Sequence, residues 1–240
     1  MNIGVIFAGG SGKRMHTKGT PKQFLEVDGK PIIIHTLEKF EMCPDVDAIV
    51  VVCLEPYIPY LKKLTERYML DKVLRIVPGG RTGQESICFG LRSAGELAGD
   101  NETIVLIHDG VRPLITKELI SENIEMAEKE GNAITVAPAT ETIFQFEQDT
   151  RVVSRIYDRS TCFVAKAPQT FRLKDILEAH EKARREQREY IDSASLMQAF
   201  GYTLHTVEST PDNIKVTTPS DYYMLKAIMT EKEHSEIFGL

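Results

Sequence analysis

Apolar runs alternate with amphipathic segments along most of the chain. The apolar runs are short and rich in Val and Ile, as are strands buried on both faces of a parallel sheet. The segments between them place apolar residues at helical spacing. We therefore expect an α/β fold in which helices cover both faces of a mostly parallel, twisted sheet. The expected strands are 3–7, 48–53, 73–77, 103–107 and 132–137, and the expected helices are 31–42, 57–68, 83–97 and 117–129.

The same alternation returns in the last third of the chain. The charged residues that close its first helix indicate a solvated face. Because the sequence has no internal repeat and no low-complexity linker, we expect residues 1–240 to form a single Rossmann-like domain. The helices expected here are 172–188 and 219–231, and the strands are 202–207 and 214–217, with a turn at 211–213.

The pattern changes between residues 139 and 171. Two segments of alternating apolar and polar residues, 142–146 and 152–157, lie on either side of a polar turn and predict a two-stranded arm. A lone hairpin of this size is only marginally stable. We expect this protruding arm to mediate dimerisation by burying its apolar side chains against a second subunit; the alternative is an arm folded back on its own sheet. Those side chains are Phe144, Phe146, Ile156 and Phe163.

Composition narrows the function classes. The chain has 240 residues and a formal net charge of −6. This charge argues against general nucleic-acid binding, which needs a basic surface that displaces counterions. No apolar run reaches membrane-spanning length, and the first expected strand leaves no room for a signal peptide. The four cysteines lack zinc-site spacing, which suits thiols in a reducing compartment. We expect a cytoplasmic protein with neither nucleic acid nor membrane as a partner.

The first expected strand leads into a glycine-rich, basic turn, 8–15, followed by Pro21-Lys22-Gln23. Glycines let backbone N–H groups close on a phosphate, and the flanking cations neutralise its charge. The turn matches neither the P-loop signature nor the Rossmann fingerprint. For the turn, the alternative is an ordinary strand–helix connection. For Lys22, the alternative is a lysine exposed on the surface. The basic residues and the Pro-Lys-Gln corner favour a phosphate-binding loop.

A lone carboxylate follows the expected strand 103–107. Asp109 stands at the carboxyl end of a parallel strand, where open α/β sheets bind ligands. A single carboxylate there suits a Mg²⁺ ion that shares the substrate's phosphates. The alternative is a turn or helix-capping role. We expect the preceding His108 to be packed or hydrogen-bonded rather than catalytic.

Four motifs occur in order along the chain. They are Ala8-Gly9-Gly10-x-Gly12-x-Arg14-Met15 with Pro21-Lys22-Gln23, His108-Asp109-Gly110-Val111-Arg112-Pro113, Ala167-Pro168-Gln169-Thr170-Phe171 and Asp212-Asn213-Ile214-Lys215-Val216-Thr217. With these motifs the chain resembles the cytidylyltransferase family that includes 4-diphosphocytidyl-2-C-methyl-D-erythritol synthase and D-ribitol-5-phosphate cytidylyltransferase. The resemblance spans essentially the whole chain and implies a nucleotide-diphospho-sugar transferase-like fold, CTP, a small polyol phosphate, Mg²⁺ and a homodimer.

The resemblance also implies roles for individual residues. Arg14, Lys22 and Lys215 are the expected catalytic cations, and Asp109 is the expected metal ligand. Arg112, Thr142 and Arg159 are expected to bind the acceptor, the last two from the arm and in the partner's site if the arm is exchanged. For Arg159 the alternative is a surface ion pair with Asp158. The expected nucleotide-binding residues are Ala8, Gly9, Gly10, Gly12, Gly80 and Ser86.

The chain departs from the family pattern at three positions. Arg81 and Gly83 stand where members commonly have an acidic residue and an arginine, which affects the expected phosphate and base contacts. Ala167 replaces a threonine that many members carry before Pro-Gln, so a hydroxyl contact with the substrate is absent there.

The two halves of the sequence favour different acceptors. Motifs in the first half are closer to the ribitol-phosphate enzymes, and those in the second half are closer to the methylerythritol-phosphate enzymes. We expect transfer of CMP from CTP to D-ribitol 5-phosphate with release of pyrophosphate; 2-C-methyl-D-erythritol 4-phosphate is the alternative acceptor. A catalytically idle nucleotide-binding module and a nucleotidyltransferase for another base or a sugar 1-phosphate are further alternatives.

Overall fold

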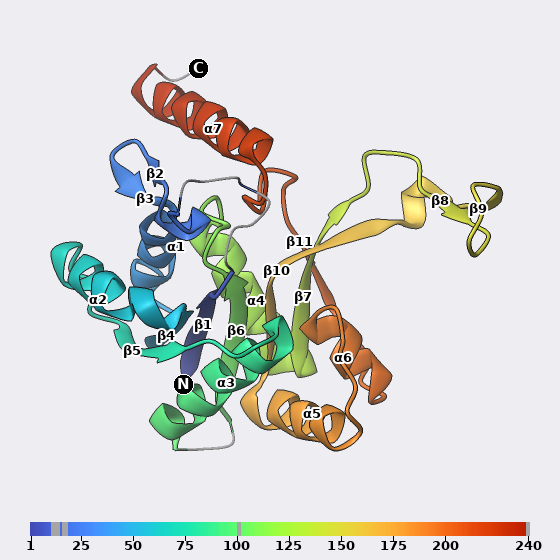
Figure 1. Ribbon diagram of the computed structural model, residues 1–240, viewed down its shortest axis with the longest axis horizontal. Helices are drawn as coiled ribbons and strands as arrows, with labels where there is room; N and C mark the ends of the chain where they lie inside the picture. The colour runs from blue at the N-terminus through green and yellow to red at the C-terminus, as the bar shows by residue number, and fades with distance from the viewer. Residues whose placement is uncertain (11–14, 16–18, 100–101, 239–240) are drawn as a thin grey trace.

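In the computed structural model, which describes residues 1–10, 15, 19–99 and 102–238, the chain folds around a seven-stranded sheet (Figure 1). The strand order is β11-β7-β10-β6-β1-β4-β5, and β10 runs antiparallel to both of its neighbours while the other pairs are parallel. The expected mostly parallel sheet is therefore confirmed. Its strands are β1 (Asn2–Ala8), β4 (Ala48–Cys53), β5 (Val73–Pro78), β6 (Ile104–Asp109), β7 (Asn132–Pro138), β10 (Phe163–Arg172) and β11 (Thr206–Glu208).

Helices cover both faces of this sheet because successive strand residues point to opposite sides. On one face, Ile6, Ile49 and Leu106 pack with α1, α2 and α4. On the other face, Val5 and Val50 pack with α3, α5 and α6. The helices are α1 (Ile32–Glu41), α2 (Ile58–Arg67), α3 (Gly83–Ala98), α4 (Lys117–Glu130), α5 (Leu173–Arg185), α6 (Ser193–Ala199) and α7 (Pro219–Phe238).

Short elements complete the fold. An Asp28-Gly29 turn with both φ angles positive joins β2 (Glu26–Val27) to β3 (Lys30–Pro31) in a small hairpin that the sequence pattern did not predict. The 3₁₀ helices are Lys22–Phe24, Glu55–Tyr57 and Arg159–Thr161.

The C-terminal third differs from the sequence prediction in three places. The expected strand 214–217 is wrong, since this segment crosses the end of the sheet as a loop tied by the bond from the Val216 amide to the Val111 carbonyl. The expected helix 172–188 ends at Arg185, and Gln187 adopts a φ of +54° that stops it. The short helix α6 then follows, and the strand expected at 202–207 begins only at Thr206.

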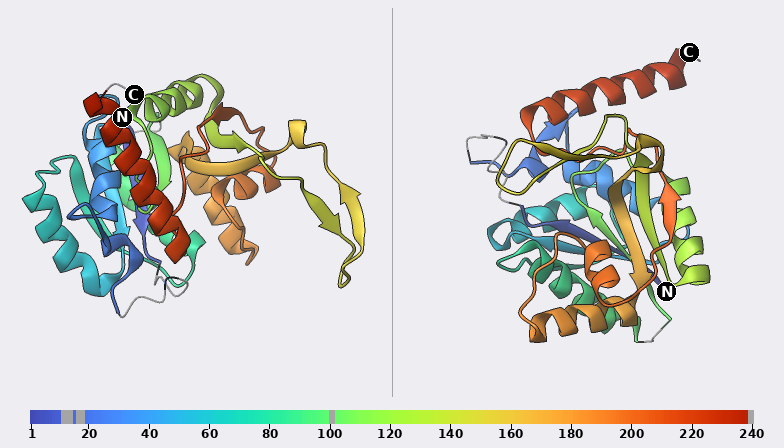
Figure 2. Two further views of the ribbon diagram at one scale, coloured as in Figure 1. Left: turned by 90° about the horizontal axis from the view of Figure 1, so that it is seen from above. Right: turned by 90° about the vertical axis from the view of Figure 1, so that its right-hand side faces the viewer.

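The arm projects away from the body of the molecule (Figures 1 and 2). Its two strands, β8 (Phe144–Phe146) and β9 (Val153–Ile156), pair with each other. Their apolar side chains are exposed, at 49% for Phe144 and 61% for Ile156, so the alternative of an arm folded back on its own sheet is wrong. The protruding part ends before residue 171, because β10 pairs with β7 from Phe163 onward.

The structure also bears on the cysteines and on membranes. All four cysteines are free; Cys43 and Cys53 are buried, while Cys88 and Cys162 are partly exposed. Within the described part of the chain, none of the helices combines the length and the apolar character needed to cross a membrane.

Candidate active site

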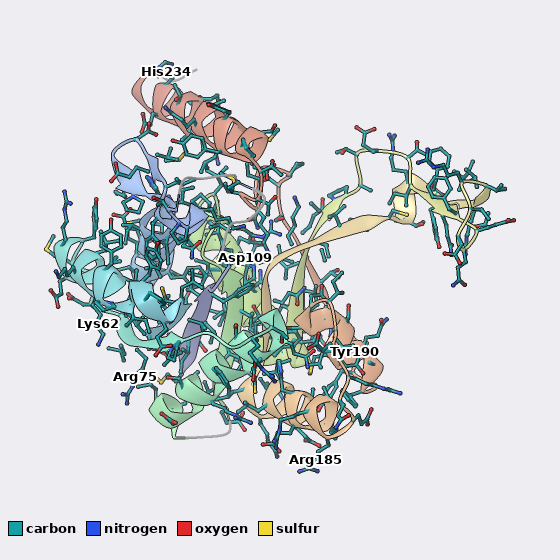
Figure 3. The ribbon with its side chains drawn as sticks, viewed as in Figure 1. Lys62, Arg75, Asp109, Arg185, Tyr190 and His234 are labelled. Atoms are coloured by element: carbon teal, nitrogen blue, oxygen red, sulfur yellow. The ribbon has the colours of Figure 1, made fainter. Side chains whose placement is uncertain are left out.

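Asp109 is the centre of the candidate site. It is the last residue of β6 and lies beside Phe7 of β1, at the carboxyl end of the sheet near the middle of the molecule (Figure 3). Its side chain is 7% exposed and accepts two cationic donors, Arg112 Nε at 2.8 Å and Lys215 Nζ at 2.5 Å. Asp109 is therefore a shared counter-ion rather than only a turn residue.

These ion pairs keep Asp109 charged. Burial alone would raise the pKa of its carboxyl group, but the charges of Lys215 and Arg112 and their hydrogen bonds outweigh burial and hold that pKa below its usual value. The ionised carboxylate in turn holds both cations in fixed positions. The result is a cationic pair beside the carboxyl end of β6 whose positions are fixed before any ligand binds.

The loop that carries Lys215 is fastened to neighbouring segments. Arg112 Nη1 donates to the Asn213 carbonyl at 2.8 Å, and Asn213 Nδ2 donates to the Ala167 carbonyl at 2.7 Å. Asn213 and Arg112 are both buried. Two motifs that are a hundred residues apart in the chain therefore meet around Asp109, as their shared presence in the family pattern implies.

Lys22 lies on the other side of this loop. It is only 9% exposed, and its Nζ donates to the Val216 carbonyl at 2.8 Å, so its interpretation as a surface lysine is wrong. The neighbouring Gln23 side chain donates to the Ala8 carbonyl at 2.6 Å. This bond fixes the end of β1, where the glycine-rich turn begins, against the 3₁₀ helix that carries Lys22.

The glycines of the turn lie beside Lys22 and helix α3. A Cβ atom added at Gly10 would contact the Lys22 side chain, and one added at Gly9 would contact the Ser86 hydroxyl, at 3.9 and 3.7 Å respectively. Ala8, Gly9, Gly10, Lys22 and Ser86 are thus brought together. Gly12 and Arg14 lie outside the described residues.

Gly80 and Ser86 form one hydrogen-bonded turn. The Gly80 amide donates to Ser86 Oγ at 2.9 Å, and the Ser86 hydroxyl donates to the Thr82 carbonyl at 2.8 Å. A Cβ at Gly80 would lie 2.5 Å from the Glu85 side chain, whose carboxylate accepts the Arg81 amide. Glycine is required there by this close approach, and Ser86 orders the turn; contact of either with a base stays a prediction.

A cavity of about 380 Å³ opens between Asp109 and the N-termini of α3 and α6. Its size suits a small metabolite. Asp109, Arg112 and Lys215 among its lining residues were predicted as site residues, and the remaining polar ones were not. Those are Thr82, Gln84, Lys166, Gln169, His180, Glu189, Tyr190, Asp192 and Ser193.

One wall of the cavity is built by Gln169 and Asp192. Gln169 Nε2 donates to Asp192 Oδ2 at 3.0 Å, while its own Oε1 accepts the Ala194 amide. Asp192 also caps α6 by accepting the Ser195 amide at 2.8 Å. The signal was present in the sequence, since Asp192 and Ser195 have N-cap spacing and Gln169 belongs to a family motif.

Thr142 and Arg159 do not reach this cavity within one chain. Both lie on the arm, which Figure 2 shows extending away from the sheet, and neither lines the cavity. Arg159 donates to the Thr140 carbonyl at 3.1 Å, while the Asp158 carboxylate accepts from Ser160. The arm thus separates these two expected acceptor residues from Asp109 of the same chain.

His108 is packed, as expected. It is fully buried, its ring lies against Phe40, and its Nε2 lies 3.2 Å from the Arg112 carbonyl. Burial lowers the pKa of His108 to about 4, so the ring is neutral near pH 7. His108 supports the Arg112 loop and supplies no acid or base to the cavity.

The candidate metal site rests on Asp109. Among the described residues, no three His, Cys, Asp or Glu side chains converge as a metal cage. Each Asp109 oxygen accepts one cation and keeps a second lone pair, so the carboxylate can supply one ligand. Mg²⁺ commonly takes one carboxylate and completes its shell with water and substrate phosphates, so the donor set fits an ion bound together with a nucleotide.

Comparison with known proteins shows which family the chain resembles over most of its length. Residues 3–231 match the family described as IspD: 2-C-methyl-D-erythritol 4-phosphate cytidylyltransferase. The chain is 50% identical to a ribitol-5-phosphate cytidylyltransferase of Vibrio parahaemolyticus serotype O3:K6, covering 100% of both chains. It is 39% identical to a 2-C-methyl-D-erythritol 4-phosphate cytidylyltransferase of Halalkalibacterium halodurans, covering 95% of this chain and 97% of that one. The crystal structure of 4-diphosphocytidyl-2C-methyl-D-erythritol synthase from Anaerococcus prevotii superposes with a TM-score of 0.83 at 27% identity, covering 95% and 96%.

Proposed function

The chain belongs to the IspD family of cytidylyltransferases, and from this premise we propose that it transfers CMP from CTP to D-ribitol 5-phosphate, forming CDP-ribitol and pyrophosphate. As a family member it is a nucleotidyltransferase that uses CTP and a sugar phosphate. The observation that carries the choice of acceptor is the 50% identity over the full length to a ribitol-5-phosphate enzyme, against 39% to a methylerythritol-phosphate enzyme. Methylerythritol phosphate, which gives the family its description, is the second candidate.

The preserved cation cluster supports an active enzyme over an idle binding module. A module that only held a nucleotide would tolerate the loss of Lys22, Asp109 or Lys215. All three are present and are tied to one loop, with Lys22 on the Val216 carbonyl and Lys215 on Asp109. Such fixed cations suit a reaction in which two anions must approach each other.

The proposed reaction is a displacement at the α-phosphorus of CTP. An oxygen of the acceptor phosphate forms a bond to that phosphorus, while the bond to the oxygen that bridges the α- and β-phosphates breaks and pyrophosphate leaves. The acceptor phosphate is already nucleophilic, so no strong general base is required. Catalysis then consists of positioning and charge stabilisation, which is the role proposed for Arg14, Lys22 and Lys215.

Each described cation has a distinct place in this scheme. Lys22, beside Gly10, faces the nucleotide side of the site. Lys215 and Arg112, both paired with Asp109, line the cavity on the acceptor side. Charge that develops on the α-phosphoryl oxygens therefore forms between fixed positive groups. Asp109 would hold Mg²⁺ together with the triphosphate oxygens, and the ion would neutralise phosphate charge there.

The proposal includes a homodimer in which each arm completes the partner's site. The family resemblance implies that Thr142 and Arg159 bind the acceptor's phosphate. Because neither residue lines the cavity of its own chain, they would do so in the partner's site. The exposed apolar residues of the arm would be buried by the same association, and a two-fold interface lets both arms do this at once. The free cysteines suit a reducing cytoplasm as the place of the reaction.

Pyrophosphate release with a panel of substrates tests the proposal. Each of the four nucleoside triphosphates is offered with ribitol 5-phosphate, methylerythritol 4-phosphate or glycerol 3-phosphate. The proposal expects turnover with CTP and ribitol 5-phosphate, and a product with the mass of CDP-ribitol. Turnover only with methylerythritol 4-phosphate would assign the second candidate function, and no turnover with any pair would favour the idle module.

A further inference from the structure

Lys166 is a cavity cation that neither the family motifs nor the proposed mechanism uses. It lies in β10, where the pairing with β7 shifts register between Ala165 and Gln169. Such an irregularity re-aims side chains, and Lys166 lines the cavity together with Asp109, Arg112 and Lys215. It thus reaches the reaction centre from a strand that carries none of the expected catalytic residues.

The strand order separates Lys166 from the nucleotide side. Strand β6, which ends at Asp109, lies between β1 on one side and β10 on the other. The glycine-rich turn and Lys22 follow β1, and neither Gly9, Gly10 nor Lys22 lines the cavity. Lys166 lies in β10 and does line the cavity. Asp109 therefore stands between the nucleotide-binding loop and Lys166.

The ammonium group of Lys166 is weakly satisfied by the protein. Its closest acceptor is the Pro211 carbonyl at 3.5 Å, which is long for a hydrogen bond, and it forms no ion pair with any described residue. Arg112 and Lys215 differ, because both are paired with Asp109. Partial burial first, and then the positive charge of Arg112, lower the pKa of Lys166, while the nearby Asp212 carboxylate opposes them without forming an ion pair with Lys166.

A partly buried ammonium beside a guanidinium calls for an anion rather than a hydroxyl group. A phosphate dianion between Lys166 and Arg112 would offset the repulsion between them and accept a charge-assisted hydrogen bond from each. The acceptor brings such a phosphate to this side of Asp109. On the basis of the proposed function, we propose that Lys166 binds the phosphate of the acceptor and determines the affinity for it, while leaving CTP binding unchanged.

Steady-state kinetics of Lys166→Met and Lys166→Arg test this assignment. Ribitol 5-phosphate is varied at saturating CTP, and CTP at saturating acceptor. A lost charge-assisted hydrogen bond should raise the acceptor KM of Lys166→Met about 10- to 100-fold, with the CTP KM within about twofold of wild type. Lys166→Arg should recover most of the loss. Lys174→Met, which removes an exposed lysine from the following helix, is the matched control and should change neither KM.

Other outcomes would overturn the proposal. An unchanged acceptor KM in Lys166→Met would mean that the ammonium serves only solvent, and an equal rise in both KM values would assign it to the nucleotide or to the fold. Calorimetric titration of ribitol 5-phosphate into each variant measures the same affinity loss without turnover. If wild type uses a different polyol phosphate, the proposed function fails but the comparison is repeated with that acceptor, so the two failures are distinguishable.

Discussion

At the scale of single residues, the site depends on one buried carboxylate that holds two cations. Asp109 binds Arg112 and Lys215, and Arg112 and Lys22 in turn bind carbonyl groups of the loop 213–216. Lys22, Arg112 and Lys215 are thus each positioned by a group of the protein rather than by substrate. Preorganisation of this kind lets positive charge act on a transition state without reorganisation at the moment of reaction.

Lys22→Ala should lower kcat about 100-fold or more while the fold persists. Removal of one preorganised donor to a developing oxyanion typically costs a factor of about 10²–10³ in kcat. Pyrophosphate release at saturating substrates measures the effect, with circular dichroism to verify folding. Lys62→Ala, at an exposed lysine of α2, is the control. A Lys22→Ala enzyme with nearly wild-type kcat would remove Lys22 from the mechanism.

Asp109→Asn should raise the Mg²⁺ concentration needed for half-maximal activity at least tenfold. The substitution keeps the side chain's shape but removes the charge that attracts the metal ion. It also leaves buried Arg112 without its counter-ion, so the melting temperature should fall as well. A titration of activity with Mg²⁺ measures the first effect and a thermal melt the second. An unchanged Mg²⁺ requirement together with a lowered melting temperature would make Asp109 a structural counter-ion alone.

Lys22, Asp109, Arg112 and Lys215 were predictable because they sit in motifs that the sequence shows. Among the charged residues that line the cavity, Lys166, Glu189 and Asp192 were not predicted. For Lys166 the omission has a physical cause: the register shift in β10 that turns it into the cavity has no signature in the alternation of residues. Ser86 donates its hydroxyl proton to its own turn and accepts one bond there, which the sequence did not indicate.

At the scale of elements, the arm leaves its apolar side chains exposed in the single chain. Phe146→Asp should convert the proposed dimer into a monomer, because a charged group in the proposed interface would be buried without a partner. The melting temperature of the body should change little, since Phe146 is 54% exposed in the isolated chain. Sedimentation velocity measures the mass, and Gln148→Asp in the arm's exposed turn is the control. A Phe146→Asp protein that stays dimeric would place the interface elsewhere.

A mixing experiment then separates dimerisation from site sharing. Lys22→Ala and Arg159→Ala proteins are mixed and allowed to exchange subunits. If the arm serves the partner, a mixed dimer has one intact site and one doubly defective site, so activity should partly recover. Exchange without recovery would mean that each arm serves its own chain.

The helices and central strands were predictable because the apolar pattern and the capping residues indicate the same element boundaries. Thr116, for example, caps α4 through the Leu119 amide, where the sequence placed the helix start. The prediction failed for a segment whose backbone hydrogen bonds go to distant loops, and for strands that are very short. Residues 214–217 look like a strand, yet Val216 bonds to Val111 and to Lys22. The small hairpin at 26–31 had an Asp-Gly turn signal but strands too short for an alternating pattern.

At the scale of the whole molecule, stability should fall as the pH drops from about 6.5 to about 4. Burial lowers the pKa of both His108 and His180 to about 4. In this window the unfolded chain binds protons that the folded protein excludes, so acid favours unfolding by up to about 1.4 kcal/mol per pH unit for each such histidine. Urea denaturation at several pH values measures this slope.

His180→Leu should reduce the number of protons taken up on unfolding by up to one, and so make the free energy of unfolding depend less steeply on pH. His35→Gln, at a partly buried histidine of α1, controls for the loss of a histidine side chain. An unchanged slope in His180→Leu would mean that His180 takes up its proton in the folded state.

A competition between the two candidate acceptors identifies the substrate of the enzyme. Wild-type enzyme is given CTP with equal concentrations of ribitol 5-phosphate and methylerythritol 4-phosphate, and the two CDP-polyols are quantified by mass during the initial rate. Their ratio equals the ratio of the two kcat/KM values. For a ribitol-5-phosphate cytidylyltransferase we expect CDP-ribitol to exceed the methylerythritol product by about tenfold or more. A predominance of the methylerythritol product would contradict it.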